Sequence, residues 1–117
     1  MHNFREMHIW KDAIAMAKNI YVLCSNFPAH EKYGLSSQLQ RAAVSVAANI
    51  AEGSGRNSEL EFKRFLNISI SSAYEVETLL AIAKEVKYIN DESYTTSIAE
   101  VQKIQKMIFN FNKQLST

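Results

Sequence analysis

Hydrophobic residues recur every three or four positions along most of the chain, the spacing of helices that bury one face. The first run predicts a helix over about residues 7–26, because Pro28 follows it and cannot continue a helix. We expect its buried stripe to consist of Trp10, Ala13, Ile14, Ala17, Tyr21 and Cys24.

A second, alanine-rich helix is predicted from Ser36 or Ser37, either of which can cap its first turn, to Gly53. Its inward residues would be Leu39, Ala42, Ala43, Val46 and Ile50. Between Arg41 and Glu52 stands the uncharged run AAVSVAANIA, so no side of this helix faces water convincingly. A helix that is apolar on nearly all sides is usually buried, and this predicts oligomerisation. The alternative is that the helix is exposed in a monomer, because isolated apolar residues are also common on protein surfaces.

Two further helices complete the chain. Ser58 and Glu61 have the spacing of a capping box and open a helix of about thirty residues, with apolar positions Phe62, Phe65, Leu66, Ala73, Val76, Leu80 and Ala83. Asn90 or Asp91 caps the last helix, whose buried positions are Ile98, Val101, Ile104, Ile108, Phe111 and Leu115. Short linkers favour antiparallel neighbours, so we expect an all-α, up-down four-helix bundle formed by residues 1–117 as one domain.

Composition narrows the range of functions. The chain has 117 residues, 47% of them hydrophobic, and a net charge of +1, which lacks the basic excess of a protein that coats nucleic acid by charge alone. One cysteine cannot form an internal disulfide, no signal peptide is evident, and the least polar stretch, 42–51, is about half the length of a membrane span. We therefore expect a cytoplasmic protein with no membrane contact.

A polar stripe runs beside the apolar side of the second helix: Gln38, Arg41, Ser45, Asn49 and Glu52 recur at steps of three and four. Its structural interpretation is a polar seam between helices or subunits, with Glu75 as the partner of Arg41. The alternative is a binding site in which Arg41 and Asn49 hold a phosphate or a base edge.

The sequence predicts no catalytic residue, metal site or cofactor, and therefore no enzyme. His2, His8 and His30 lie near or outside helix ends, where we expect them to be solvated, and no Glu-x-x-His pattern occurs. Cys24 lies on an apolar stripe and is interpreted as a small buried hydrophobe. The run from Gly53 to Arg56 is interpreted as a turn between helices.

Four basic residues are the candidates for a contact with nucleic acid, namely Arg41, Arg56, Lys63 and Arg64. Glu59 and Glu61 dilute their charge on a single chain. A ring-shaped oligomer would repeat each of them around its axis and multiply the effect.

The stretch 27–66 resembles a four-helix-bundle family whose founding members are encoded in intervening sequences of bacterial 23S ribosomal RNA genes and are often labelled ribosomal proteins. The residues that carry the resemblance are Phe27-Pro28, Glu31, Tyr33-Gly34-Leu35, Gln38-Leu39, Arg41-Ala42-Ala43, Ser45, Asn49-Ile50-Ala51-Glu52-Gly53 and Phe65-Leu66. Weaker likeness extends from Trp10 to Tyr88. The chain departs from the family pattern at Ser69, Ile70, Ser71 and Lys87.

The resemblance implies a small non-enzymatic bundle. A related accessory protein of diversity-generating retroelements forms a homopentamer and associates with its reverse transcriptase and with nucleic acid. The resemblance therefore implies a homopentamer that binds RNA or another nucleic acid, or alternatively an accessory subunit of a nucleic-acid enzyme such as a reverse transcriptase.

Overall fold

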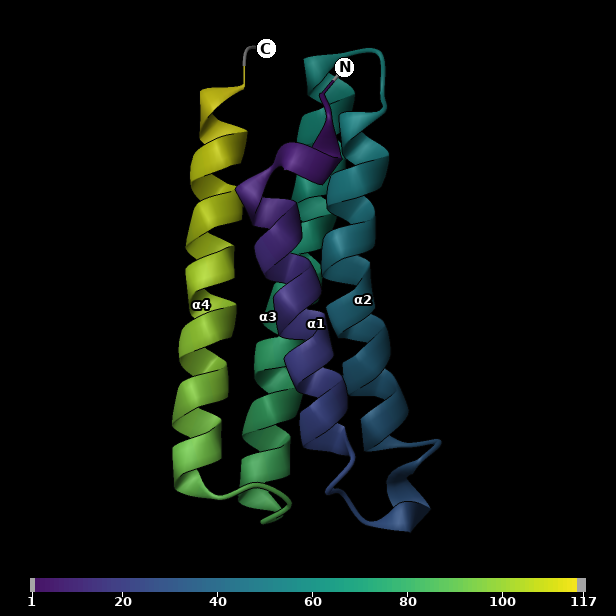
Figure 1. Ribbon diagram of the computed structural model, residues 1–117, viewed down its shortest axis with the longest axis vertical. Coiled ribbons are helices and arrows are strands. Elements are labelled where there is room, and N and C mark those ends of the chain that lie inside the picture. The colour runs from purple at the N-terminus through teal and green to yellow at the C-terminus, as the bar shows by residue number, and fades with distance from the viewer. Residues whose placement is uncertain (1, 116–117) are drawn as a thin grey trace.

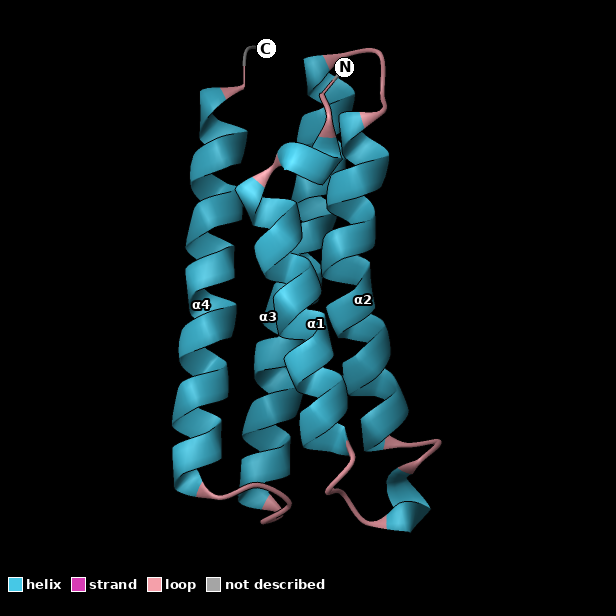
Figure 2. Cartoon of the chain, viewed as in Figure 1, coloured by secondary structure: helices cyan, strands magenta, loops and turns pink. Residues whose placement is uncertain are grey.

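Four long helices account for most of the chain in the computed structural model, which describes residues 2–115 (Figures 1 and 2). They are α1 (His8–Cys24), α2 (Leu35–Ser54), α3 (Glu59–Glu85) and α4 (Asp91–Gln114). Two single turns of 3-10 helix, η1 (Phe4–Glu6) and η2 (Ala29–Glu31), precede α1 and α2, and the described residues include no strand. The prediction of an all-α chain with four helices is confirmed.

Successive helices run antiparallel and form a ring around one core (Figure 1). Helix α1 packs against α2 and α4, and α3 packs against the same two, so α2 and α4 lie at opposite corners of the bundle. The particle measures 44 × 24 × 20 Å. Among the described helices, none is both long and apolar enough to cross a membrane.

Side-chain caps mark where two of the helices begin. The Ser58 hydroxyl accepts the Glu61 amide at 3.1 Å, and the Asn90 side chain accepts the Ser93 amide at 2.7 Å, as the sequence predicted for α3 and α4. The predicted serine cap of α2 is wrong. Helix α2 begins at Leu35, whose amide donates instead to the Glu31 carboxylate at 3.0 Å, so the cap comes from η2.

The core confirms the predicted apolar faces of α3 and α4 but corrects that of α1. Ile14 and Tyr21, expected inside, are 45% and 49% exposed, and the buried side of α1 consists of Ile9, Ala13, Met16, Ile20 and Cys24. Helix α1 is apolar around more than half of its circumference, so several stripes of helical spacing compete. The choice among them is made by the packing of α2 and α4.

The uncharged run of α2 does present one side to water. Ala42, Ala43, Val46, Ala47 and Ile50 are buried in the core, whereas Val44 is 45% exposed and Ala48 is exposed. The expectation that no side of this helix faces water is therefore wrong in its strict form. The part of this run that is exposed to solvent is a narrow apolar strip, which includes Val44 and Ala48.

Gly53 belongs to the last turn of α2 and is buried against α3, so its expected place in the turn is also wrong. A Cβ atom at this position would lie 2.7 Å from the Cβ of Phe65 and 2.8 Å from Cδ1 of Phe62. Both distances are shorter than carbon atoms tolerate, so the glycine is required because the helices approach closely. The linker to α3 begins at Gly55.

Replacing Gly53 with alanine should lower the free energy of unfolding by about 1–3 kcal/mol, because the added methyl group overpacks the contact with α3. Chemical denaturation of the two proteins measures this difference. Gly55→Ala is the matched control. Its Cβ would meet only Glu52 O at 3.7 Å and its φ is −87°, so a change within about 1 kcal/mol is expected. Equal effects at both positions would contradict the packing argument.

Candidate functional site

A shallow groove of about 560 Å³ runs along the outer side of α2. It is lined by Tyr21 of α1 and by Ser37, Gln40, Arg41, Val44, Ser45, Ala48 and Asn49 of α2. A second depression of about 330 Å³ shares Tyr21 and Gln40 with it and extends to Pro28 and Lys32. Three members of the predicted polar stripe, Arg41, Ser45 and Asn49, therefore lie in a real concavity.

The middle of the polar stripe joins α2 to α3. The hydroxyl groups of Ser45 and Ser72 are 2.8 Å apart, and the Asn49 side-chain amide donates to the Ser45 carbonyl oxygen at 2.8 Å. Gln38 and Glu52, at the ends of the stripe, are exposed, and among the described residues their side chains form no ion pair with another helix. Within the chain the structural interpretation thus describes Ser45 alone, because both hydrogen bonds of Asn49 stay inside α2. The ends of the stripe stay available to another molecule.

Two serines of α3 were missed by the sequence reasoning. Ser69 is fully buried and donates its hydroxyl to the Val46 carbonyl oxygen at 2.7 Å, and Ser72 meets Ser45 as described above. Their signal was available, because both are small polar residues set among the apolar positions of α3. Small side chains there allow α2 to approach, and each hydroxyl finds an acceptor or donor across the interface.

The expected ion pair between Arg41 and Glu75 does not form. Within residues 2–115, the ion pairs shorter than 4 Å join His2 to Glu59, His30 to Glu31 and Arg64 to Glu61. Arg41 and Glu75 are both exposed, and an exposed pair gains little over the hydration of its separate charges. Arg41 consequently presents a free guanidinium group to the groove.

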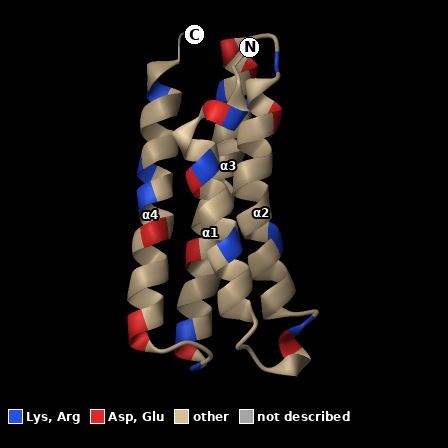
Figure 3. Ribbon diagram, in the orientation of Figure 1, with Lys and Arg blue, Asp and Glu red and all other residues tan. Residues whose placement is uncertain are grey.

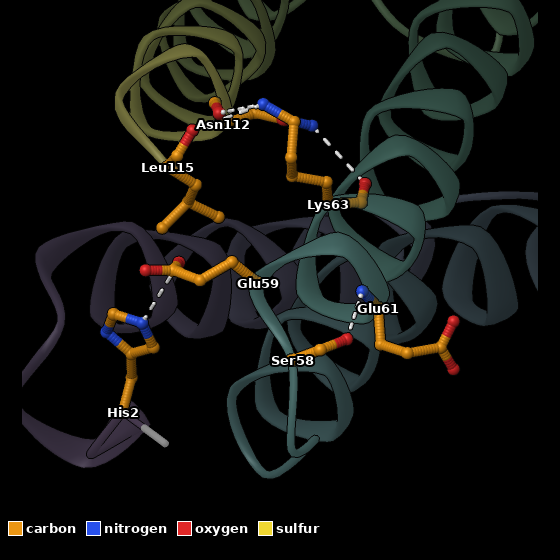
Figure 4. A network of polar contacts seen from close by, with 7 residues as sticks. All are labelled: His2, Ser58, Glu59, Glu61, Lys63, Asn112 and Leu115. Atoms are coloured by element: carbon orange, nitrogen blue, oxygen red, sulfur yellow. Dashed lines mark hydrogen bonds and ion pairs between the residues drawn. The ribbon is translucent and has the colours of Figure 1, made fainter. Parts of the chain in front are cut away.

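Three of the four basic candidates are engaged within the chain. The Lys63 ammonium group donates to the backbone oxygen of Asn112 at 3.0 Å and of Leu115 at 3.5 Å, which satisfies the last carbonyls of α4 (Figure 4). Arg64 pairs with Glu61 at 3.0 Å. The Arg56 guanidinium group lies 4.6 Å from the centre of the Phe65 ring.

The four candidates do not gather on one surface patch. Arg41 lies thirteen residues before the end of α2 at Ser54, which places it roughly 20 Å along the helix axis from that end. Arg56, Lys63 and Arg64 all follow that end, in the linker and the first turns of α3. Their role in nucleic-acid binding stays a prediction.

His2 is solvated only in part, because its side chain is 37% exposed and also packs against two aromatic rings. Its ring lies 4.9 Å from that of Phe62 and 6.1 Å from that of Phe111, and its Nε2 is 3.6 Å from Glu59 Oε2, an atom that is buried without a hydrogen bond (Figure 4). These contacts hold the amino-terminal segment against α3 and α4. His8 and His30 are exposed.

Two further titratable groups have structural roles. Cys24 is buried, as predicted, and burial raises the pKa of its thiol to about 11, which leaves it protonated at neutral pH. Glu31 accepts the Leu35 amide and the Tyr88 hydroxyl, the latter at 2.7 Å. These two hydrogen bonds, with a smaller contribution from the charge of His30, lower the pKa of Glu31. Among the described residues, no three His, Cys, Asp or Glu side chains are placed to hold a metal ion.

Comparison with known proteins identifies a family and a similar solved structure. The model of the family described as 23S rRNA-intervening sequence protein matches residues 5–110. A crystal structure of a protein of unknown function from the S23 ribosomal protein family of Bacteroides thetaiotaomicron is similar, with a TM-score of 0.81 and 26% sequence identity. The alignment covers 91% of this chain and 99% of that one. A comparison with curated proteins found no match.

Lys63→Met should lower the free energy of unfolding by about 1 kcal/mol, because the last carbonyls of α4 lose a charged donor while the aliphatic stem is kept. Urea denaturation provides the measurement. Arg64→Met removes an exposed pair one position away and should change stability by less than about 0.5 kcal/mol. A Lys63 variant as stable as the Arg64 variant would show that Lys63 has no structural role.

Tyr88→Phe should destabilise the protein near neutral pH and much less in acid. Because the pKa of Glu31 is lowered by folding, its contribution is complete above the ordinary pKa of glutamate, about 4.3, and is lost as the pH falls through the lower pKa of the folded state. The difference in unfolding free energy between wild type and Tyr88→Phe should therefore shrink as the pH falls below about 4. Tyr94→Phe, at a half-buried tyrosine of α4, should give a difference that does not follow this titration.

Proposed function

The chain belongs to the 23S rRNA-intervening sequence protein family, and from the outer face of α2 we propose that it works by assembling with copies of itself. The observation that carries the proposal is the apolar strip in the groove, where Val44 and Ala48 of α2 lie beside Tyr21 of α1. Val44 and Tyr21 are 45% and 49% exposed in the single chain. A second copy would remove this surface from water.

The helices that pack against α2 also carry exposed apolar side chains. Ile14 of α1 is 45% exposed and Ile68 of α3 is 48% exposed, so a partner copy that covers them as well would gain further apolar contact. Burying the exposed half of one such side chain contributes about 1 kcal/mol. Several such side chains must be buried together for stable assembly, because association must first offset an estimated 4–15 kcal/mol of lost translational and rotational freedom.

The shape of the face favours a closely packed helix from the other copy. Ser37, Val44 and Ala48 have short side chains, so a partner helix can approach the backbone of α2. Arg41 adds a charge that has no carboxylate partner among residues 2–115 of its own chain. In a contact between two different faces, Arg41 can meet a carboxylate of the next copy, such as exposed Glu52 or Glu75.

A closed ring is the assembly we propose. Each subunit of a ring takes part in two interfaces, whereas a subunit of a dimer takes part in one, so a modest surface stabilises a ring more effectively. Five subunits is the number implied by the family resemblance described above.

The proposal includes no reaction. The groove offers two serine hydroxyls and one arginine, but its lining contains no imidazole, thiol or carboxylate to act as a general base. Binding of RNA through the four predicted basic residues and partnership with a reverse transcriptase both stay predictions.

Light scattering after size-exclusion chromatography tests the assembly. We expect the wild-type mass to be a multiple of the 13.3 kDa subunit, five-fold for the proposed ring. Ala48→Lys and Val44→Lys each place a charge in the apolar strip and should shift the protein to monomers at micromolar concentration. Both sites are exposed, so circular dichroism should show the helices intact.

Ala99→Lys is the matched control, since Ala99 is an exposed alanine on α4, away from the groove. This variant should keep the wild-type mass. A monomeric wild-type protein would overturn the proposal, and so would an Ala48→Lys variant that keeps the wild-type mass.

A further inference from the structure

The outer face of α4 has a charge pattern that neither the bundle core nor the groove of α2 explains. From Val101 to Leu115 this helix and its cap contain Lys103, Lys106 and Lys113 and no carboxylate (Figure 3). All three lysines are exposed. The acidic residues of α4, Asp91, Glu92 and Glu100, lie before this segment, so its surface is basic although the chain as a whole is nearly neutral.

An aromatic ring lies among these lysines. Phe109 is 58% exposed, three residues after Lys106 and four before Lys113, which places the three side chains on neighbouring turns of one helix side. The Lys113 ammonium group is 6.0 Å from the ring centre. Because Phe109 buries less than half of its surface, it contributes less to the core than Val101, Ile104 and Ile108, which are at most 1% exposed.

Two carboxylates lie beside this part of α4. Glu77 of α3 accepts the side-chain amides of Gln102 and Gln105, and Glu100 accepts that of Asn19. These neutral donors leave both negative charges in place, but neither carboxylate forms an ion pair with a lysine of α4 within residues 2–115. Asp12 and Glu100 line a small depression with Lys103, which weakens the potential at that lysine. Lys106, Phe109 and Lys113 share one side of α4, and neither lysine belongs to an ion pair among the described residues; we call these three residues the α4 strip.

We propose that the α4 strip binds single-stranded nucleic acid. A base stacks on the exposed Phe109 ring while the phosphates on either side pair with Lys106 and Lys113, which stand roughly 10 Å apart along the helix axis. Single strands fit because their base faces are free, whereas a duplex offers only edges and backbone to a flat surface. The strip differs from the four basic residues expected from the sequence and needs no second copy of the chain.

The position of the strip is compatible with the proposed assembly without depending on it. Helices α2 and α4 occupy opposite corners of the bundle, so the groove of α2 and the α4 strip are separate surfaces. A monomeric Val44→Lys protein should still bind, which separates failure of this inference from failure of the assembly.

Fluorescence anisotropy with labelled eight-nucleotide single-stranded RNA and DNA of mixed sequence, at low and moderate salt, provides the test. Phe109→Ala and Phe109→Leu should both weaken binding roughly 5- to 100-fold, because neither side chain stacks on a base. Lys106→Gln with Lys113→Gln should lower the slope of log affinity against log salt by roughly 1.4, about 0.7 for each phosphate that is no longer neutralised. The charge-matched control, Lys18→Gln with Lys32→Gln, should keep most of the affinity.

Four outcomes would overturn the inference. The first is no binding by the wild type at low salt, and the second is equal loss of affinity in the two lysine pairs, which would mean diffuse charge attraction. The third is tighter binding to a duplex of the same length. The fourth is a Phe109→Ala protein with a changed mass in light scattering but unchanged affinity, which would make the strip a contact between protein subunits.

Discussion

The close approach of α2 to α3 is the constraint on which the rest of the bundle depends. It is possible because the facing residues are small: Gly53 leaves room for Phe62 and Phe65, and Ser45 meets Ser72 through their hydroxyl groups. Ser69 adds a buried hydrogen bond to the backbone of α2. Packing this tight becomes less favourable if either helix rotates or shifts, so it fixes the register of the pair. Helices α1 and α4 then cover the remaining sides of the same core.

This constraint also explains the outer face of α2. A helix that packs closely on α3 and is flanked by α1 needs small residues on more than one side, and Ala42, Ala43 and Ala47 serve that need within the chain. The same composition leaves Val44 and Ala48 outside, where short side chains form a shallow groove with Tyr21. Two requirements therefore explain the unusual composition of α2. Most of its small residues fill the chain's own core, and those on the narrow exposed strip are left for a partner.

The sequence predicted the fold well because helical periodicity and capping are local properties. Ser58 and Asn90 cap the helices they were expected to cap, and the buried stripes of α3 and α4 follow their spacing. The errors arise where the outcome depends on distant partners. The buried side of α1 is chosen by its neighbours, the cap of α2 comes from Glu31, and Gly53 looks like a turn residue until Phe62 and Phe65 are placed beside it. For the same reason the sequence identified Arg41 and Lys63 as candidates for a contact with nucleic acid, but it could not show whether either charge was already engaged within the chain.

The contrast between Lys63 and the lysines of α4 shows how structural and functional charges can be separated. Lys63 is half-buried and donates to two backbone carbonyls, so its charge has a structural role within the chain. A single cation near the last turn is enough to offset the dipole of α4, and Lys113 is already a second one. Lys106 lies two turns earlier, exposed and without a carboxylate partner in the part of the chain that the structure describes, where a charge adds almost nothing to stability. An exposed Phe109 beside it likewise contributes little to folding, so the fold alone gives no reason for either side chain to be there.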